Sequence, residues 1–231
     1  MAPNESTAAH FARLHDGFTD VADGVERVWV TCAPGEAETI AADAAGRGLQ
    51  HTRTLLQLRR PLPVTDRPPA PLIQTRAFRP EVDLSAWVEA NNAAFAWHPD
   101  QGHQTVESLL AQMAEPWYDP EGFRILELDG TLAGFCWTKV HEDETPPLGE
   151  IYVIATAPEF AGRGLGLALT LDGLDHLFAV RGVTEAMLYV ESDNTAALRT
   201  YDRLGFDHHL TRMAFVAGPD EAADARPSQR P

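Results

Sequence analysis

Apolar residues recur along the chain with helical and strand-like spacings, and the clearest example lies between residues 149 and 192. One helical face is formed by Leu167, Leu171, Leu174 and Phe178, which recur every three or four residues. Runs rich in β-branched and other apolar residues flank this helix at 150–156 and 185–190, as is typical of strands. The pattern therefore predicts a strand, a glycine-rich loop, a helix and a second strand.

The same reasoning extends to the rest of the chain. It predicts strands at 28–32, 52–58, 72–78, 123–128, 131–140 and 207–216, and helices at about 8–18, 36–45, 84–95, 105–114 and 194–204. Asp129-Gly130, between two of these strands, is a strong signal for a tight hairpin turn.

Side-chain directions follow from the same periodicities. In the helix at 105–114, the residues expected to face inward are Val106, Leu109, Leu110 and Met113. Strand alternation places Glu150, Tyr152 and Ile154 on one face of their strand, and Ile151, Val153 and Ala155 on the other. It also places Lys139 on the same face as Phe135 and Trp137.

A proline-rich segment at residues 60–71 divides the chain, because such a segment is extended and semi-rigid. We predict an N-terminal part at 1–60, a linker at 61–71, a main domain at 72–217 and a disordered tail at 218–231. The strand, helix and strand of 28–58 repeat the order at the end of the chain when Gly48-Leu49 is aligned with Gly205-Phe206. A generic extension with this order is the alternative.

Composition narrows the functional class. The 231 residues carry a formal net charge of −16, which argues against nucleic-acid binding and requires local positive charge for any anionic ligand. No apolar run reaches transmembrane length and no secretion signal is present. The two cysteines, Cys32 and Cys136, lie far apart in apolar surroundings. We expect a cytoplasmic protein without a metal site or a disulfide framework, and we favour a monomer, although the sequence leaves the oligomeric state open.

The glycine-rich loop, Ala161-Gly-Arg-Gly-Leu-Gly166, precedes a helix, where backbone N–H groups and the helix dipole favour an anion. A P-loop would need Gly-Lys-Ser/Thr, and a dinucleotide fingerprint would need a small residue where Leu169 stands. The loop instead resembles motif A of the GNAT acetyltransferases, with Ala161 replacing the usual first Gln or Arg. A glycine turn that only caps a core helix is the structural alternative.

A second signature favours the GNAT resemblance. Residues 194–206 match N-x-x-A-x-x-x-Y-x-x-x-G-F, the family's next motif in sequence order. The resemblance implies a mixed α/β GNAT acyltransferase fold that uses acetyl-CoA as co-substrate. It implies CoA contacts from Ile154, Ala155, Thr156, Ala161, Gly162, Arg163, Gly164, Leu165, Gly166, Leu167, Asn194, Thr195, Ala196, Ala197, Leu198 and Arg199.

Acetyl transfer to an amine needs a base for the ammonium and an acid for the departing thiolate. By the resemblance, Tyr201 falls on the family's usual acid. Glu150 opens the core strand where an amine would enter, and apolar neighbours would raise the pKa of its carboxyl group toward the working pH. A packed helix aromatic and a solvated strand-end glutamate are the alternatives for these two residues.

Longer motifs narrow the resemblance further. H-P-D-Q-G at 98–102, E-P-W-Y-D-P at 115–120, G-F-C-W-T-K-V-H at 134–141, G-E-I-Y-V at 149–153 and L-Y-V-E-S-D-N at 188–194 resemble the mycothiol synthase family of tandem GNAT enzymes. The substrate positions of that family fall on Lys139, Glu150 and Tyr189. Asp100 falls on another, where the family usually has the longer Glu.

The resemblance implies acetylation of the cysteinyl amine of a cysteine–glucosamine–inositol precursor, a small-molecule substrate. Residues 1–60 then resemble the end of an inactive first GNAT domain without its front half. The alternatives are a GNAT enzyme for another amine, such as a peptide N-terminus or an aminoglycoside, and a non-catalytic acyl-CoA-binding module. For Lys139, an ion pair with Glu142 is the structural alternative to substrate contact.

Overall fold

The computed structural model describes residues 6–22, 24–96, 98 and 102–218 of the chain. These residues belong to two compact units. The first unit comprises Met1–Leu58, Tyr189–Thr195 and His208–Pro231, and the second comprises Arg59–Leu188 and Ala196–Asp207. Asp100 and residues 219–231, for which the sequence predicts a substrate contact and a disordered tail, lie outside the described residues.

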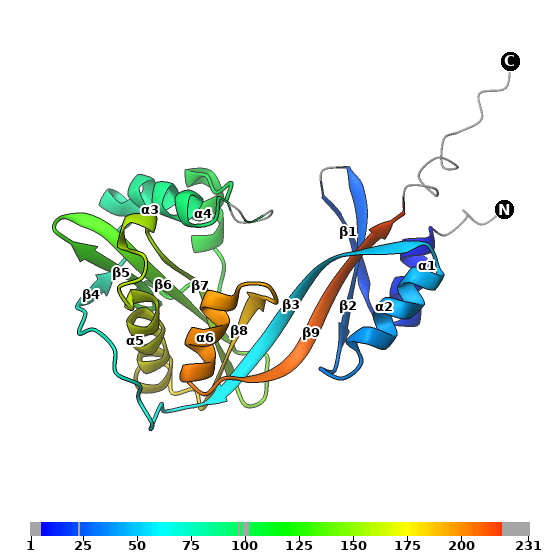
Figure 1. Ribbon diagram of the computed structural model, residues 1–231. Helices are drawn as coiled ribbons and strands as arrows, with labels where there is room; N and C mark the ends of the chain where they lie inside the picture. The colour runs from blue at the N-terminus through cyan, green and yellow to red at the C-terminus, as the bar shows by residue number, and fades with distance from the viewer. Residues whose placement is uncertain (1–5, 23, 97, 99–101, 219–231) are drawn as a thin grey trace, which may run out of the picture. The chain divides into compact units, whose positions relative to one another are not determined.

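The second unit is built on a mixed sheet whose strands run in the order β8-β7-β6-β5-β4 (Figure 1). The strands are β4 (Thr75–Ala77), β5 (Phe123–Leu128), β6 (Thr131–His141), β7 (Leu148–Thr156) and β8 (Glu185–Glu191). The helices are α3 (Pro80–Ala94), α4 (Val106–Met113), α5 (Leu165–Ala179) and α6 (Thr195–Arg203), with short 3-10 turns η1 (Pro120–Gly122) and η2 (Pro158–Phe160). Figure 1 shows α3 and α4 on one side of this sheet and α5 on the other.

Aromatic rings form the core between this sheet and α3. The Phe123 ring stacks on the rings of both Phe78 and Trp137 with centroids 4.3 Å apart, and Trp87 of α3 meets Phe123 edge-on at 5.5 Å. All four side chains are at most 3% exposed. Burial of such large rings supplies much of the free energy that holds a domain together.

The tight turn predicted at Asp129-Gly130 is confirmed between β5 and β6. Both residues have positive φ angles, of 53° and 76°, as such a hairpin turn requires. The next pair of strands is less regular. Trp137 of β6 pairs with Val153, but its neighbour Thr138 pairs with Ile151, so Tyr152 is an extra residue in β7. Such a β-bulge reverses the side-chain alternation beyond it.

The bulge corrects the predicted faces of β7. Val153 and Ala155 pair with Trp137 and Phe135 and pack with Tyr152 in the α3-side core. Ile154 pairs with Cys136 on the opposite, α5-side face. Tyr152 and Ile154 therefore do not share a face as predicted, and Ile151 does not share one with Val153.

Two predicted inward-facing helix positions are also wrong. Helix α5 is buried on most of its circumference, yet Phe178 near its end is 39% exposed. In α4 the buried position is Leu109, whereas Leu110 is 45% exposed. Phe178 lies near the C-terminal end of α5, and α4 packs against α3 with Leu109 as its buried residue.

The first unit contains α1 (Thr7–Leu14), β1 (Phe18–Ala22), β2 (Val25–Cys32), α2 (Ala37–Gly46), β3 (Leu49–Pro61) and β9 (Asp207–Ala217). Its strands run in the order β1-β2-β9-β3, and α1 and α2 contribute to one buried cluster with β2 and β9. The sequence did not predict β1. The predicted helix at 8–18 ends at Leu14, because the chain turns at Asp16 with φ of 51°.

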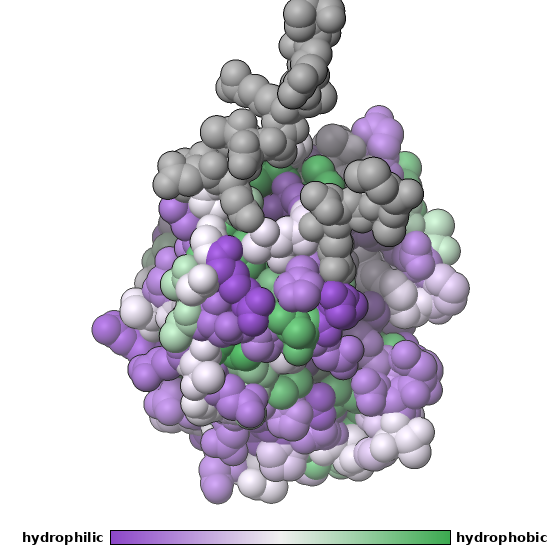
Figure 2. Space-filling view, turned by 90° about the vertical axis from the view of Figure 1, so that its right-hand side faces the viewer, coloured by the Kyte–Doolittle hydropathy of each residue, from purple (hydrophilic) through white to green (hydrophobic). Residues whose placement is uncertain are grey.

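Three strands contribute residues to both units, since β3, β8 and β9 each cross a unit boundary. The two units are therefore not separated at one point of the sequence, and the boundary at residues 61–71 stays a prediction. None of the described helices is long and apolar enough to cross a bilayer. Figure 2 shows one face of the molecule, where hydrophilic residues predominate between small apolar patches.

Gly173 allows α5 to approach the sheet closely. A Cβ atom there would lie 2.6 Å from Cys136 Sγ and 2.9 Å from Ile151 Cδ1. Gly173→Ala should therefore lower the free energy of unfolding by about 1–3 kcal/mol, although alanine favours helix by up to about 1 kcal/mol. Urea unfolding measures this change. Gly46→Ala is the control, since a Cβ at the last residue of α2 meets nothing within 4 Å; equal effects of the two substitutions would contradict the packing argument.

Candidate active site

Glu150 lies at the N-terminal end of β7, on the side of the sheet that faces α3. It pairs with Lys139 of β6 in the antiparallel ladder and with Met187 of β8 in the parallel one. The residue is 7% exposed, and its Oε2 atom lies 2.7 Å from Nε2 of His141. A buried carboxylate near the end of a strand is thus held by one histidine.

Lys139 lies beside Glu150 against two aromatic rings. Its Nζ atom is 4.8 Å from the centroid of Trp117 and 5.6 Å from that of Tyr152, which are cation–π distances. Glu142, the alternative partner, instead pairs with Arg181 at 2.9 Å. Lys139 shares its face with Phe135 and Trp137, which confirms that prediction.

Trp117 and Tyr152 are site residues that sequence reasoning did not single out. Their rings meet at 4.9 Å, and both pack on Trp137. Burial raises the pKa of the Tyr152 phenol, and the nearby carboxylates of Glu150 and Glu115 raise it further. Lys139, which these two rings contact, is the only lysine in the chain, and this was the one feature of the sequence that could have drawn attention to their surroundings. We call the rings of Trp117 and Tyr152 the aromatic wall.

Asp119 anchors the segment that carries Trp117. Its Oδ2 atom lies 2.8 Å from His176 Nε2 of α5 and 2.9 Å from Arg181 Nη1. Burial raises the pKa of the Asp119 carboxyl group, but the hydrogen bonds from His176 and Arg181 outweigh it and hold the pKa below its usual range. The aromatic wall is therefore tied through the segment's backbone to the helix on the opposite face.

The glycine loop has the backbone geometry of an anion cradle. Gly162 and Gly164 both have positive φ, of 75° and 76°, and Gly164 is the N-cap of α5. Within the described chain, the backbone N–H groups of residues 162–167 donate to no protein acceptor. Arg163 adds a guanidinium 4.9 Å from the Phe160 ring. Seven of the predicted CoA contacts, residues 161–167, are thus gathered at one helix N-terminus.

Tyr201 is buried in α6 on the other side of the sheet from Glu150. It is 7% exposed and meets the Phe206 ring at 5.7 Å. Burial raises the pKa of the phenol, and the thiol of Cys136 on the α5-side face adds to this. Tyr201 therefore keeps its proton at neutral pH, and the predicted acid and base belong to opposite faces of the sheet.

The other predicted contacts are distributed over both units. Ile154, Ala155 and Thr156 form the C-terminal end of β7 in the second unit, and residues 196–199 form the start of α6. Tyr189, Asn194 and Thr195 belong to the first unit. There the Tyr189 hydroxyl accepts a hydrogen bond of 2.6 Å from Gln57, and Arg212 lies 4.9 Å from the Tyr189 ring centroid.

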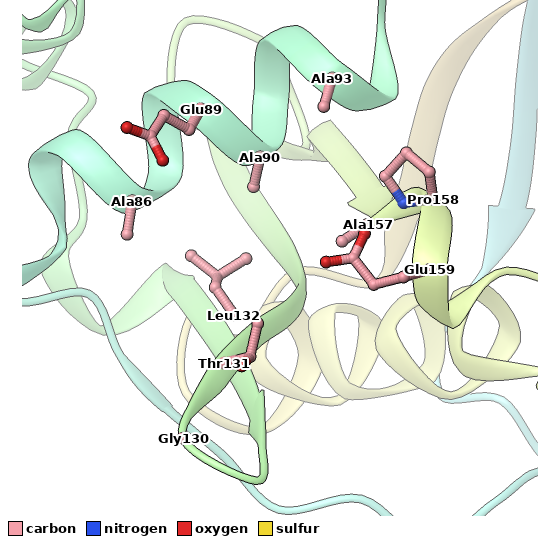
Figure 3. A pocket seen from close by; sticks show the side chains of 10 residues that line it. All are labelled: Ala86, Glu89, Ala90, Ala93, Gly130, Thr131, Leu132, Ala157, Pro158 and Glu159. Atoms are coloured by element: carbon pink, nitrogen blue, oxygen red, sulfur yellow. The ribbon is translucent and has the colours of Figure 1, made fainter.

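Figure 3 shows a separate pocket of about 370 Å³ on the α3 side of the second unit. Its lining consists of Ala86, Glu89, Ala90, Ala93, Gly130, Thr131, Leu132, Ala157, Pro158 and Glu159. None of the predicted site residues lines it, so the pocket is distinct from the site around Glu150. Among the described residues, no group of three or more His, Cys, Asp or Glu residues is placed to hold a metal ion.

The sequence pattern of the acetyltransferase (GNAT) family matches residues 84–206, which include the wall, the glycine loop and Tyr201. The chain belongs to this family. A solved GNAT relative, the GCN5-related N-acetyltransferase from Sphaerobacter thermophilus, aligns with a TM-score of 0.63 at 25% identity, over 84% of this chain and 61% of that one. The GNAT fold predicted from the two signatures is thus confirmed.

Curated relatives of this chain are named as one specific enzyme of the GNAT family. The mycothiol acetyltransferase of Acidimicrobium ferrooxidans is 50% identical over 81% of this chain, and that of Thermomonospora curvata is 42% identical over 94%. The aligned region covers 61% of the first relative and 72% of the second. The chain thus spans about three fifths of the length of the first of these GNAT relatives.

Replacing the anchor of the aromatic wall should destabilise the GNAT unit. We expect Asp119→Asn to lower the free energy of unfolding at pH 7 by about 1–3 kcal/mol, because His176 and Arg181 lose a largely buried anion. A lowered folded-state pKa gives stability that is present above the ordinary aspartate pKa and is lost as the pH falls through the folded value. The difference should therefore shrink below about pH 4.

Urea unfolding of both proteins at pH 7 and pH 3 checks this expectation. Asp175→Asn is the matched control, because its pair with Arg67 is about half exposed and should contribute little. A difference that is independent of pH would show that the Asp119 charge is not what stabilises the segment.

Proposed function

We propose that this protein transfers the acetyl group of acetyl-CoA to the cysteinyl amine of the cysteine–glucosamine–inositol precursor, giving mycothiol. The observation that carries the proposal is the cross-strand pair of Lys139 and Glu150, set against the aromatic wall. In this pair the Glu150 carboxylate, the proposed base, lies beside the Lys139 ammonium, a hydrogen-bond donor. The curated name shared by the relatives that are 50% and 42% identical supports this choice of amine.

The glycine loop is suited to the pyrophosphate of acetyl-CoA. Its backbone N–H groups at residues 162–167 supply donors, and Arg163 supplies positive charge within a chain of net charge −16. A loop that binds through backbone groups needs no opening Gln or Arg, which accounts for Ala161. We infer that Ile154–Thr156 and the start of α6 at 194–199 contact the rest of the co-substrate.

The proposed reaction combines proton transfers with the exchange of a carbon–sulfur bond for a carbon–nitrogen bond. The Glu150 carboxylate takes a proton from the substrate ammonium, and the freed amine attacks the thioester carbonyl carbon. The nitrogen then releases its second proton to water, the carbon–sulfur bond breaks, and the buried Tyr201 hydroxyl donates its proton to the CoA thiolate. A phenol whose pKa is raised by burial stays protonated until the thiolate forms. Solvent then reprotonates Tyr201 and the base is regenerated.

Substrate choice follows from the groups around the amine. A glucosaminyl-inositol carries many hydroxyl groups, and a fixed ammonium such as Lys139 donates strong hydrogen bonds to them. We infer that Tyr189 and Asp100 make further contacts with this substrate, as the family resemblance implies. The two cysteines are free and buried, which fits a reducing cytoplasm.

A panel assay tests the proposed function. Thiol release from acetyl-CoA would be measured with the cysteinyl-glucosaminyl-inositol precursor, free cysteine, an N-terminal peptide and an aminoglycoside. We expect the precursor to have the highest kcat/KM. A higher value for another amine would reassign the substrate, and binding of acetyl-CoA without turnover of any amine would favour a non-catalytic module.

Removing the proposed acid should slow turnover without weakening co-substrate binding. We expect Tyr201→Phe to lower kcat by roughly ten- to a thousandfold, with little change in the KM for acetyl-CoA, because the phenol acts only as the thiolate departs. Steady-state kinetics measure both values. Tyr118→Phe also removes a partly buried hydroxyl but from the core beside Trp137, so it should retain kcat within about threefold; equal losses would remove the acid role from Tyr201.

The only lysine should govern recognition of the sugar. We expect Lys139→Met to raise the KM for the precursor by on the order of tenfold or more, because a charged hydrogen bond is lost while the side-chain length is kept. The affinity for acetyl-CoA, measured by calorimetry, should barely change. Acetylation of free cysteine is the matched control, since cysteine lacks the sugar, and equal slowing of both amines would show that Lys139 does not contact the sugar.

A further inference from the structure

We propose that His141 is a positioning residue for acetyl transfer, which holds the Glu150 carboxylate so that one oxygen is left for the substrate amine. This inference rests on the proposed function, because it takes Glu150 as the base. It concerns a residue that is not among the catalytic residues predicted from the sequence. Its support comes from the contact between the two side chains, from the strand register and from the exposure of each group.

The strand register brings the two side chains together. His141 ends β6 two residues after Lys139, so the two share a face of the sheet, and Lys139 pairs directly with Glu150. His141 is thus a diagonal neighbour of Glu150, within reach of a long side chain. Its Nε2 atom lies 2.7 Å from Glu150 Oε2, a normal length for a hydrogen bond to a carboxylate.

The chemistry of the contact fixes the direction of the hydrogen bond. An ionised carboxylate only accepts, so Nε2 of His141 must carry the hydrogen and donate it. In a neutral imidazole, Nδ1 is then the unprotonated nitrogen. The other carboxylate oxygen, Oε1, accepts no hydrogen bond from the described residues. It is also not one of the described polar atoms that are fully buried and lack a partner.

His141 and Glu150 differ in exposure in a way that suits a positioning residue and a base. The Glu150 side chain is 9% exposed and that of His141 is 24% exposed. The histidine therefore closes one side of the carboxylate while remaining in contact with solvent. Without it, the carboxylate could rotate away from the amine, and a displacement of about 1 Å at a reacting group can cost up to about a hundredfold in rate.

Other charged groups surround this pair and bear on its pH dependence. On the same face are the Lys139 ammonium and the Tyr152 phenol, and Glu115 is close enough to Tyr152 to raise the pKa of that phenol. Beyond the end of β6 are Glu142, paired with Arg181, and the exposed Asp143 and Glu144. A cationic imidazolium at His141 would form an ion pair with the Glu150 carboxylate, whereas a glutamine amide at this position cannot carry a charge.

Two substitutions separate positioning from packing. His141→Gln retains an N–H donor but cannot titrate, and His141→Phe retains a flat ring but cannot donate. We expect the Gln variant to keep kcat within about threefold and to move the acidic limb of the pH–rate profile to lower pH. The Phe variant should lose ten- to a hundredfold in kcat, on the order of a 1 Å misplacement. His51→Gln, at an exposed histidine bonded to Thr54, is the control.

Calorimetric acetyl-CoA affinity and urea unfolding show whether each variant is folded. Equal losses of kcat in the Gln and Phe variants would overturn the proposal, as would an unchanged kcat in a folded Phe variant. An acidic limb that stays in place in the Gln variant would likewise contradict it. If the Phe variant does not fold, the Gln variant and the next measurement decide.

A measurement without any substrate distinguishes this proposal from the proposed function. Nitrogen-15 NMR of the histidine rings should show a hydrogen on Nε2 of His141 in the wild type, and Glu150→Gln should shift that signal. A His141 protonated only on Nδ1, or one indifferent to Glu150→Gln, would overturn the positioning role whatever amine is acetylated. If the wild type turns over no amine but shows the expected tautomer, the proposed function fails and the pairing of His141 with Glu150 stands.

Discussion

The register between β6 and β7, with the extra residue Tyr152, is the constraint on which the site depends. On the N-terminal side of the bulge in β7, the register sets Glu150 opposite Lys139. On the C-terminal side, Val153 pairs with Trp137 and lies in the aromatic core. Without the extra residue, every side chain on one side of this point would change faces. Glu150 at the polar end of β7 and Val153 at its apolar end lie on the same face only because the extra residue stands between them.

Charged groups at this face are stabilised by specific partners. Burying a charge is costly unless it is compensated, and here the aromatic wall receives the Lys139 ammonium while His141 binds the Glu150 carboxylate. The wall in turn depends on Asp119, which joins its segment to His176 across the sheet. The glycine loop offers backbone N–H groups to the anion that we propose it binds, in a chain whose net charge of −16 opposes anions at long range.

Local signals in the sequence were sufficient for features that depend on neighbouring residues. Asp129-Gly130 specified the hairpin turn, and glycines at positive φ specified the loop before α5, because backbone sterics act over a few residues. The sequence could not show the bulge at Tyr152 or the approach of Trp117 to Lys139, since these depend on pairing between distant segments. Phe178 fits the apolar stripe of α5 but lies beyond the part of the helix that the sheet covers.

The sharing of β3, β8 and β9 between the two units has a consequence for any shortened form of the protein. Removing the residues before Arg60 would delete β2, the antiparallel neighbour of β9 at Thr211–Val216, and most of β3, its other neighbour. The backbone donors and acceptors of β9 would then be unpaired on both sides of a strand rich in apolar residues, which invites other chains to add to it. Such a fragment would be prone to self-association even with every reacting group intact, so solubility, and not chemistry, would set how far the N-terminal elements can be trimmed.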